Sequence, residues 1–190
     1  MEYDEDDFIE DEIRTAEEIA KRALVLGSLI ATVYGTSLPN TISWLKSENL
    51  WEELSPDELD YIKNPTNNKA QVNLSWRTEA LVVLLWSINK VSSLPPLTAK
   101  CDIELLKSVL VYPSNSTKSF ISSAKLRDED EISSAYEEVY DSHWSVRDAR
   151  IHGKPIPNNL DAGVVYERHF GFNYVTGYSG LPWDEITCDT

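Results

Sequence analysis

The feature that most constrains this fold is an uninterrupted apolar run, Ala80–Trp86, near the middle of the 190-residue chain. A helix built from this run is apolar on every face, and such a helix is stable only when other elements surround it. Val-rich runs also occur as buried strands, but the length of the pattern and its polar flanks favour a helix over 72–90. The run therefore predicts a buried central helix.

Capping patterns and apolar spacing predict further helices around this one. Thr15 with Glu18, and Ser55 with Glu58, match the capping box, in which both side chains bond free N–H groups of the first turn. Helix starts, helical periodicity and stop signals extend the prediction along the chain. The expected helices are 15–35, 40–45, 55–64, 72–90, 102–110, 129–151 and 162–175. We expect an all-α fold of about seven helices, with at most one short strand around Val109–Tyr112.

The charge of the chain is strongly acidic and partly concentrated at one end. It carries 17 Lys and Arg against 32 Asp and Glu, a formal charge of −15, and eight of the eleven residues 2–12 are acidic. Nucleic-acid binding relies on clustered Lys and Arg, so this class is excluded. We divide the chain into an acidic arm, 1–12, and a single helical domain, 13–190. The arm is expected to be weakly packed because its like charges repel; a docking arm for a basic partner is the alternative.

Two further observations bear on compartment and redox state. The acidic N-terminus is the opposite of a secretory signal, and no run approaches the ~18 apolar residues of a membrane span. Cys101 and Cys188 have no spacing that suggests a disulfide framework or a zinc site. We expect two reduced thiols in a cytoplasmic protein that does not insert into a membrane, and we expect neither a metal nor a cofactor.

Four motifs carry a family resemblance. They are Arg77-Thr78-Glu79-Ala80-Leu81, His143-Trp144 with Arg147-Asp148-Ala149, Val164-Val165-Tyr166-Glu167-Arg168-His169 with Asn173, and Trp183-Asp184-Glu185 with Asp189-Thr190. In this order they resemble DUF4272, a bacterial family of domains of unknown function, from about Ile13 to the C-terminus. The resemblance implies a cytoplasmic bacterial protein with a mostly helical fold, and it implies no reaction, substrate or partner. Gly171, inside the last helix, departs from the family's pattern.

The charged side chains of these motifs flank the most apolar segments. They are Arg77, Glu79, His143, Arg147, Asp148, Glu167, Arg168 and His169. A buried charge must be paired, so we expect this cluster to converge, with at least one Arg–carboxylate pair bridging two helices. If the pair made by Arg147 is buried, Arg147→Ala should destabilise the fold by about 3–5 kcal/mol.

The cluster has two interpretations. It is either an ion-pair network that fixes how three helices pack, or a polar site in which Arg77 or Arg147 clamps an anion, a Glu acts as base and a His moves the proton. A metal site would need the two histidines and one carboxylate, but no ligand spacing supports it. The chain lacks a nucleophile elbow and a phosphate-binding loop. These absences favour a non-enzymatic role without closing the alternative.

Aromatic content supplies the remaining lead. The chain has six Trp, nine Tyr and four Phe, more than a core of this size requires, and exposed aromatics anchor protein interfaces. The residues we expect to contribute to an exposed patch are Trp44, Trp51, Tyr174, Tyr178 and Trp183. We therefore expect a non-catalytic, cytoplasmic protein-binding domain that binds, and in one form neutralises, a basic partner. The alternative is a ligand-binding domain or enzyme that holds an anionic small molecule in the charged cluster. The oligomeric state is left open.

Overall fold

The structure, a computed structural model, describes residues 11–110, 112 and 117–190, and within these residues every regular element is helical. The all-α prediction is therefore confirmed. The α-helices are α1 (Ala16–Val33), α2 (Leu38–Ser47), α3 (Pro56–Lys63), α4 (Asn68–Trp76), α5 (Thr78–Ser87), α6 (Ile103–Val109), α7 (Thr117–Ser122), α8 (Glu129–Ile151) and α9 (Ala162–Val175). Short 3-10 turns are η1 (Trp51–Glu53), η2 (Pro157–Asn159), η3 (Tyr178–Gly180) and η4 (Trp183–Glu185). No helix among the described residues is long and apolar enough to cross a membrane.

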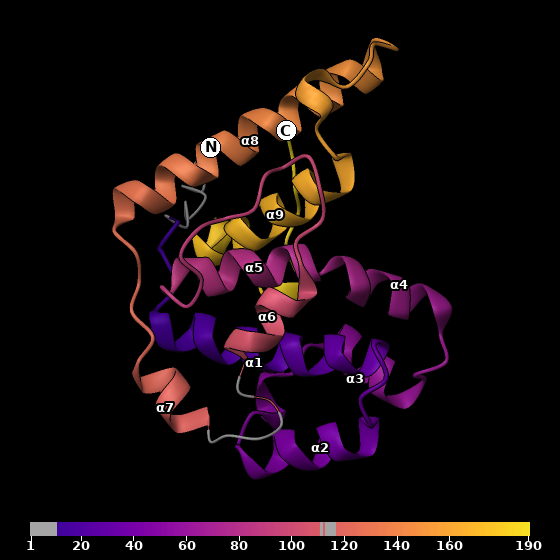
Figure 1. The fold of residues 1–190 in the computed structure, drawn as a ribbon, viewed down its shortest axis with the longest axis vertical. Helices are drawn as coiled ribbons and strands as arrows, with labels where there is room; N and C mark the ends of the chain where they lie inside the picture. Colours follow the sequence, from indigo (N-terminus) through magenta and orange to yellow (C-terminus); the bar gives the residue numbers. More distant parts are fainter. Residues whose placement is uncertain (1–10, 111, 113–116) are drawn as a thin grey trace, which may run out of the picture.

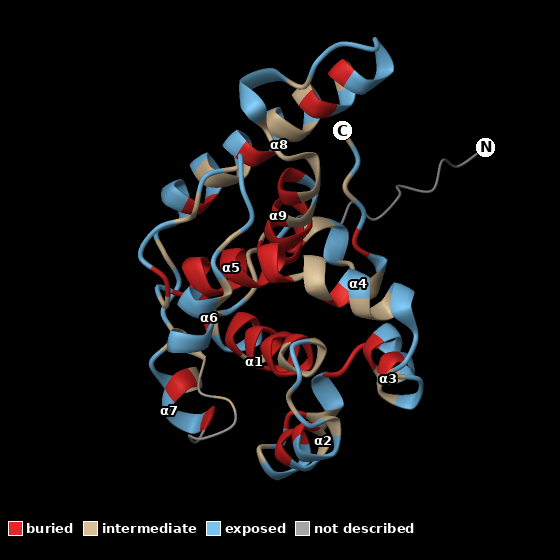
Figure 2. Cartoon of the chain, turned by 45° about the vertical axis from the view of Figure 1, so that its right-hand side comes forward, coloured by how far each residue is buried: buried red, intermediate tan, exposed pale blue. Residues whose placement is uncertain are grey.

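Helix α5 lies at the centre, as the apolar run predicts. All ten of its residues are buried. It packs between α1 and α9, and α8 lies over the outer side of α9 (Figure 1). Burial is concentrated in α1, α5 and α9 (Figure 2). The polar motifs of the chain consequently meet on α9 and on the two helices, α5 and α8, that cover it.

The predicted single helix over 72–90 is wrong, because the chain breaks at Arg77. Arg77 ends α4 with φ −58° and ψ −8°, and its carbonyl accepts the N–H of Leu81 to begin α5. Next to the break, the Thr78 hydroxyl donates to the carbonyl oxygen of Ser75 at 2.8 Å. At the other end, α5 stops at Ser87, and Asn89 follows with φ +58°, a conformation that Asn tolerates.

No strand occurs in the described residues around 109–112, in line with the expectation of at most one short strand; Val109 ends α6, and residue 111 lies outside the described part. Helix α7 has no predicted counterpart. The Thr117 backbone N–H and hydroxyl both donate to the carboxylate of Glu48, at 3.0 and 2.8 Å. A residue 69 positions away thus starts this helix, which local spacing does not show.

The expected acidic arm lies mostly outside the described residues, and only its last two members are placed. The carboxylate of Asp11 accepts the backbone N–H of Ser179 at 2.7 Å. The Glu12 carbonyl lies so close to Gly177, which has φ +69°, that a side chain there would collide with it. The end of the arm therefore packs on the segment that follows α9, and the boundary between arm and domain stays a prediction.

Candidate functional site

The charged cluster predicted from the sequence is divided into separate pairs rather than gathered into one site. Helix α9 contributes one partner to each of three pairs, and the other partners come from the start of α5 and from α8. The pairs are Glu79–Arg168, Arg77–Glu167 and His143–His169. Arg147 and Asp148 join none of them.

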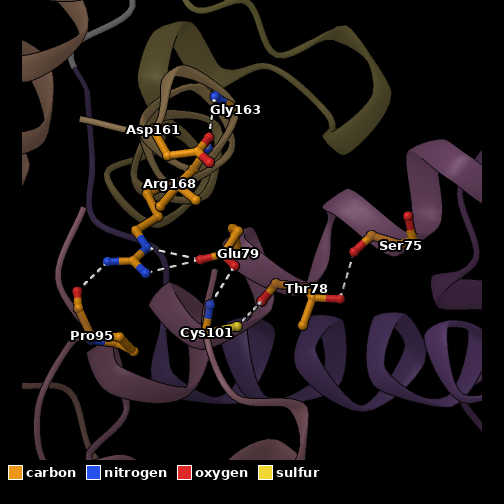
Figure 3. A network of polar contacts seen from close by, with 9 residues as sticks. Ser75, Thr78, Glu79, Pro95, Cys101, Asp161, Gly163 and Arg168 are labelled. Carbon is orange, nitrogen blue, oxygen red and sulfur yellow. Dashed lines mark hydrogen bonds and ion pairs between the residues drawn. The ribbon is translucent and has the colours of Figure 1, made fainter. Parts of the chain in front are cut away.

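The Glu79–Arg168 pair is completely enclosed. Both side chains are at most 2% exposed, and the Nε and Nη2 atoms of Arg168 donate to Glu79 Oε2 at 3.1 and 2.9 Å. Arg168 Nη1 also donates to the carbonyl of Pro95, and Glu79 Oε1 accepts the backbone N–H of Cys101 at 2.7 Å (Figure 3). The network ties α5, α9 and the connection between α5 and α6 together. Neither charge is left for a ligand.

Both cysteines are placed where the thiol stays protonated. Burial, helped by the Glu79 carboxylate, raises the pKa of Cys101 to about 12. Burial likewise raises the pKa of Cys188 to about 12. A nucleophilic cysteine needs a lowered pKa and access to substrate, so neither residue suits that role.

The Arg77–Glu167 pair is only partly enclosed. The Nη1 atom of Arg77 donates to Glu167 Oε2 at 2.8 Å, and the guanidinium lies 3.5 Å from the centre of the Phe170 ring. Burial raises the pKa of Glu167, although the charge of Arg77 opposes this effect. Arg77 is thus fixed by a carboxylate on one side and by an aromatic face on the other.

The two histidines form a pair between α8 and α9. Their Nδ1 atoms lie 2.8 Å apart, so one nitrogen donates and the other accepts. Tyr136 and Tyr140 lie beside the His169 ring, with centroids 5.8 and 5.5 Å away, and Tyr166 contacts the His143 ring edge-on at 5.7 Å. This surrounding is mainly aromatic.

Their environment keeps both histidines neutral at neutral pH. Burial lowers the pKa of His169 to about 4, and the neighbouring His143 adds to this effect. Burial also lowers the pKa of His143, helped by Arg147 and Arg150. Because each ring is neutral, a single N–H···N bond joins them.

Arg147 and Asp148 point away from these pairs. The guanidinium of Arg147 is exposed and donates to the backbone carbonyl of Thr190. Asp148 lies 2.9 Å from the Nδ1 atom of His152, near the end of α8. The expected convergence of all eight residues therefore does not occur. Among the described residues, no group of three or more His, Cys, Asp or Glu is arranged to hold a metal ion.

Two surface hollows border the pairs. One of about 270 Å³ lies beside the histidines and is lined by Trp76, His143, Arg150 and Tyr166, among others. A second of about 540 Å³ lies between α3, α4 and η4. Its carboxylates include Glu58, which lies 2.5 Å from Arg22, so part of its charge is already paired. The enclosed Glu79–Arg168 pair reaches neither hollow.

Exposed aromatic side chains lie elsewhere than expected. Trp44, Tyr174 and Trp183 are buried, while Trp51 and Tyr178 are half-buried. Four large exposed side chains instead lie on α8 and the adjoining part of α9. They are Tyr140, Trp144, Ile151 and Tyr166, with exposed fractions of 38%, 55%, 69% and 42%. We call these four residues the α8 surface.

The signal for the α8 surface was present in the sequence. Tyr140, Trp144 and Ile151 follow the spacing i, i+4, i+11, which places them along one side of a helix. The opposite side carries Val139 and Val146, which are buried. The helix thus has two apolar stripes. The body of the domain covers the stripe with Val139 and Val146, and the second stripe stays exposed.

Comparison with known proteins gives one family and no relative. The model of a domain of unknown function, DUF4272, matches residues 5–186. No curated protein and no solved structure matches the chain.

Proposed function

We propose that this chain, which belongs to the DUF4272 family of domains of unknown function, is a non-catalytic protein-binding domain. The observation that carries the proposal is the α8 surface, Tyr140, Trp144, Ile151 and Tyr166. Contiguous exposed apolar side chains mark interaction sites on folded domains. The cytoplasmic location expected from the sequence remains a prediction.

Most of the α8 surface lies outside the face that packs α8 against the body, although Tyr140 and Tyr166 also contact the His169 and His143 rings. The inner face of the helix is supplied by Ile132, Val139, Val146 and Ala149, each at most 3% exposed. Trp144, in contrast, has an exposed fraction of 55%. Trp and Tyr are the residues most enriched among interface hot spots. A protein partner would cover side chains that the fold itself leaves open to water.

The state of the charged residues supports the same proposal. A site for an anionic substrate needs cationic groups that are free to contact it. Arg168 and Arg77 are instead joined to Glu79 and Glu167. The pKa values of the two thiols are raised, as described above. These side chains are therefore better suited to fixing the packing of α9 than to chemistry.

The test is site-specific photo-crosslinking in cells that naturally express the chain. A photoreactive phenylalanine replaces Trp144 in one variant and Val72 in the control. Val72 is an apolar residue of α4 with an exposed fraction of 46%. We expect a discrete protein adduct from position 144 and none from position 72. Absence of an adduct at 144, or the same adducts at both positions, would contradict the proposal.

One observation favours a second candidate, the binding of an anionic small molecule. The 270 Å³ hollow is lined by Arg150 and His143 and by the rings of Trp76 and Tyr166. Thermal melts with inorganic phosphate, citrate and adenosine monophosphate test it. A ligand-induced rise in Tm that disappears in Arg150→Ala would support this candidate, and unchanged melts with all three would remove it.

A further inference from the structure

Trp144 has an unusual set of neighbours. Residues three and four positions away are adjacent on a helix surface. For Trp144 these are Tyr140, Asp141, Arg147 and Asp148. An exposed indole thus has an aromatic ring and Arg147 on one side and two carboxylates on the other.

The carboxylates form a row along the solvent side of α8. Glu137, Asp141 and Asp148 are separated by four and seven residues, so they lie beside the stripe of Tyr140, Trp144 and Ile151. Glu137 and Asp141 are exposed, and neither forms an ion pair with any residue in 11–110, 112 or 117–190. Asp148 is shared between His152 and, at 4.0 Å, Lys154. We call Glu137, Asp141 and Asp148 the acidic row.

Among the cations around the row, Lys154 lies 4.0 Å from Asp148, and Arg147 is engaged elsewhere. Arg147 is directed to the carbonyl of Thr190. Residues 129–142 contain six Asp and Glu and no Lys or Arg. Glu137 and Asp141 therefore keep their negative charge beside the apolar stripe.

We infer that the partner covering this face presents a basic amphipathic helix; the inference rests on the proposed protein-binding function. Its apolar side packs on Tyr140, Trp144 and Ile151, as a helix does in an apolar groove. Its Lys or Arg side chains reach the acidic row and lie over the indole of Trp144, where carboxylates and a π-face both attract a cation. The stretch 137–151 is about 21 Å long at about 1.5 Å per residue, so the partner helix needs about four turns.

The negative charge of this face favours a basic helix over a second copy of the chain as the partner. Antiparallel two-fold pairing through α8 would bring each acidic row close to another. The chain as a whole carries −15, which adds to the repulsion between copies. A basic helix meets the same surface with complementary charge.

The experiment uses the full chain and a labelled synthetic peptide of about 18 residues, with Leu at helical spacing and Lys or Arg on the flanks. Fluorescence anisotropy is measured at about 0.15 M salt, where exposed charges beyond about 8 Å are screened. We expect Trp144→Ala to weaken binding about tenfold or more. Asp141→Lys should do the same, because it reverses one charge of the acidic row.

Matched controls separate this surface from general attraction to an acidic protein. Glu52→Lys makes the same charge change on η1, where Glu52 is exposed, and Val72→Ala removes an exposed apolar side chain from α4. Both should change binding less than about twofold. A peptide of the same composition without helical period should bind at least about tenfold more weakly. Circular dichroism checks that each variant keeps its helices.

Several results would overturn the inference. They are no binding of the basic helix, equal binding of the aperiodic peptide, equal weakening by Glu52→Lys, and tight binding of a Glu-for-Lys peptide. Self-association that depends on Trp144, seen by sedimentation, would also overturn it. If any of these occurs while position 144 still crosslinks to a protein in cells, the proposed function stands and only the partner class is wrong.

Discussion

At the scale of single residues, the buried carboxylate of Glu79 on α5 is stable only because Arg168 pairs with it. Glu79 lies on the most apolar helix and is 2% exposed. We predict that Glu79→Gln lowers the free energy of unfolding by about 3–5 kcal/mol, because the Arg168 guanidinium would stay buried without a counter-charge. Urea denaturation followed by circular dichroism measures the loss. Glu104→Gln is the control, since Glu104 and Lys107 form an exposed pair at 2.7 Å and should contribute about 0–1 kcal/mol. Equal small losses would contradict the prediction.

Arg147 shows the opposite case. From the sequence, we expect Arg147→Ala to lower the free energy of unfolding strongly only if Arg147 forms a buried pair. In the structure its side chain is exposed and donates to the backbone carbonyl of Thr190. We now predict a loss of less than about 1 kcal/mol, the scale of ordinary surface substitutions. The same denaturation measurement checks it, and a loss of about 3 kcal/mol or more would show that Arg147 is part of a buried network.

The histidine pair makes stability depend on pH. Burial lowers the pKa of His169 from its ordinary value of about 6.5 to about 4. Above about pH 6.5 the ring is neutral in both states and has no effect. As the pH falls from about 6.5 towards about 4, the unfolded chain binds a proton that the folded chain does not, so stability decreases, by up to about 3 kcal/mol.

The measurement is the free energy of unfolding between about pH 7.5 and about pH 4.5. His169→Phe keeps a buried aromatic ring and removes the titrating group. We expect a flatter pH dependence in this variant than in the natural chain, because carboxylate titration is common to both. An equally steep decrease in His169→Phe would show that other groups account for the loss.

At the scale of elements, the close packing of α5 on α9 depends on Gly171. A Cβ atom at this position would lie 3.0 Å from Ala80 Cα and 3.1 Å from Ala80 O. Gly→Ala in an exposed helix stabilises by about 1 kcal/mol. Here we predict that Gly171→Ala destabilises by about 1–3 kcal/mol, because the backbone of α5 must move. Thermal or urea denaturation measures it, with Ser134→Ala on exposed α8 as control; a stabilised Gly171→Ala would refute the tight contact.

The elements that could be predicted from the sequence are those with local causes. The capping boxes at Thr15 and Ser55 are both formed, and α1 and α3 begin where these boxes predict. The break at Arg77 and the start of α7 at Thr117 are not predicted by the spacing of apolar residues. The latter requires Glu48, which is distant in sequence.

The candidate site divides in the same way. The rule that buried charges must be paired correctly anticipates partners for Glu79 and Arg168 on different helices. It does not specify which Arg joins which Glu, because that depends on the rotation of α9 about its axis. The sequence does not predict the exposure of Trp144 for a related reason: this exposure depends on which side of α8 meets α9. Burial of a side chain on an amphipathic helix is thus set by neighbouring elements.

At the scale of the whole molecule, the role of a charged residue depends on the layer of helices in which it lies. The Glu79–Arg168 pair between α5 and α9 lies inside the stack and is satisfied there, whereas α8 is the outer layer (Figure 1). A charge on the outer side of α8 contacts water or a partner. This explains why one long helix carries both buried apolar residues and the carboxylates Glu137 and Asp141, which have no ion-pair partner in the described part of the chain.

The contacts of the N-terminal residues with the rest of the domain determine how much these residues contribute to stability. The domain holds the start of the described chain through Arg14. Its backbone N–H donates to Val175 O, its side chain donates to Tyr174 O at 2.9 Å and Leu181 O at 2.7 Å, and its guanidinium lies 4.4 Å from the centre of the Tyr174 ring. Three hydrogen bonds at about 1 kcal/mol each and one cation–π contact of about 0.5–1 kcal/mol set the expected scale.

We therefore predict two different results for two truncations. Removing residues 2–10 should change the free energy of unfolding by less than about 1 kcal/mol, because a block of like charges gains little from ordering. Removing residues 2–14 should cost about 2–4 kcal/mol, because the Arg14 contacts and the Asp11 bond to Ser179 are lost together. Urea denaturation of both truncated chains against the full chain measures the difference. If the shorter truncation already costs as much as the longer one, the acidic arm contributes to the fold and its role as a solvated segment is wrong.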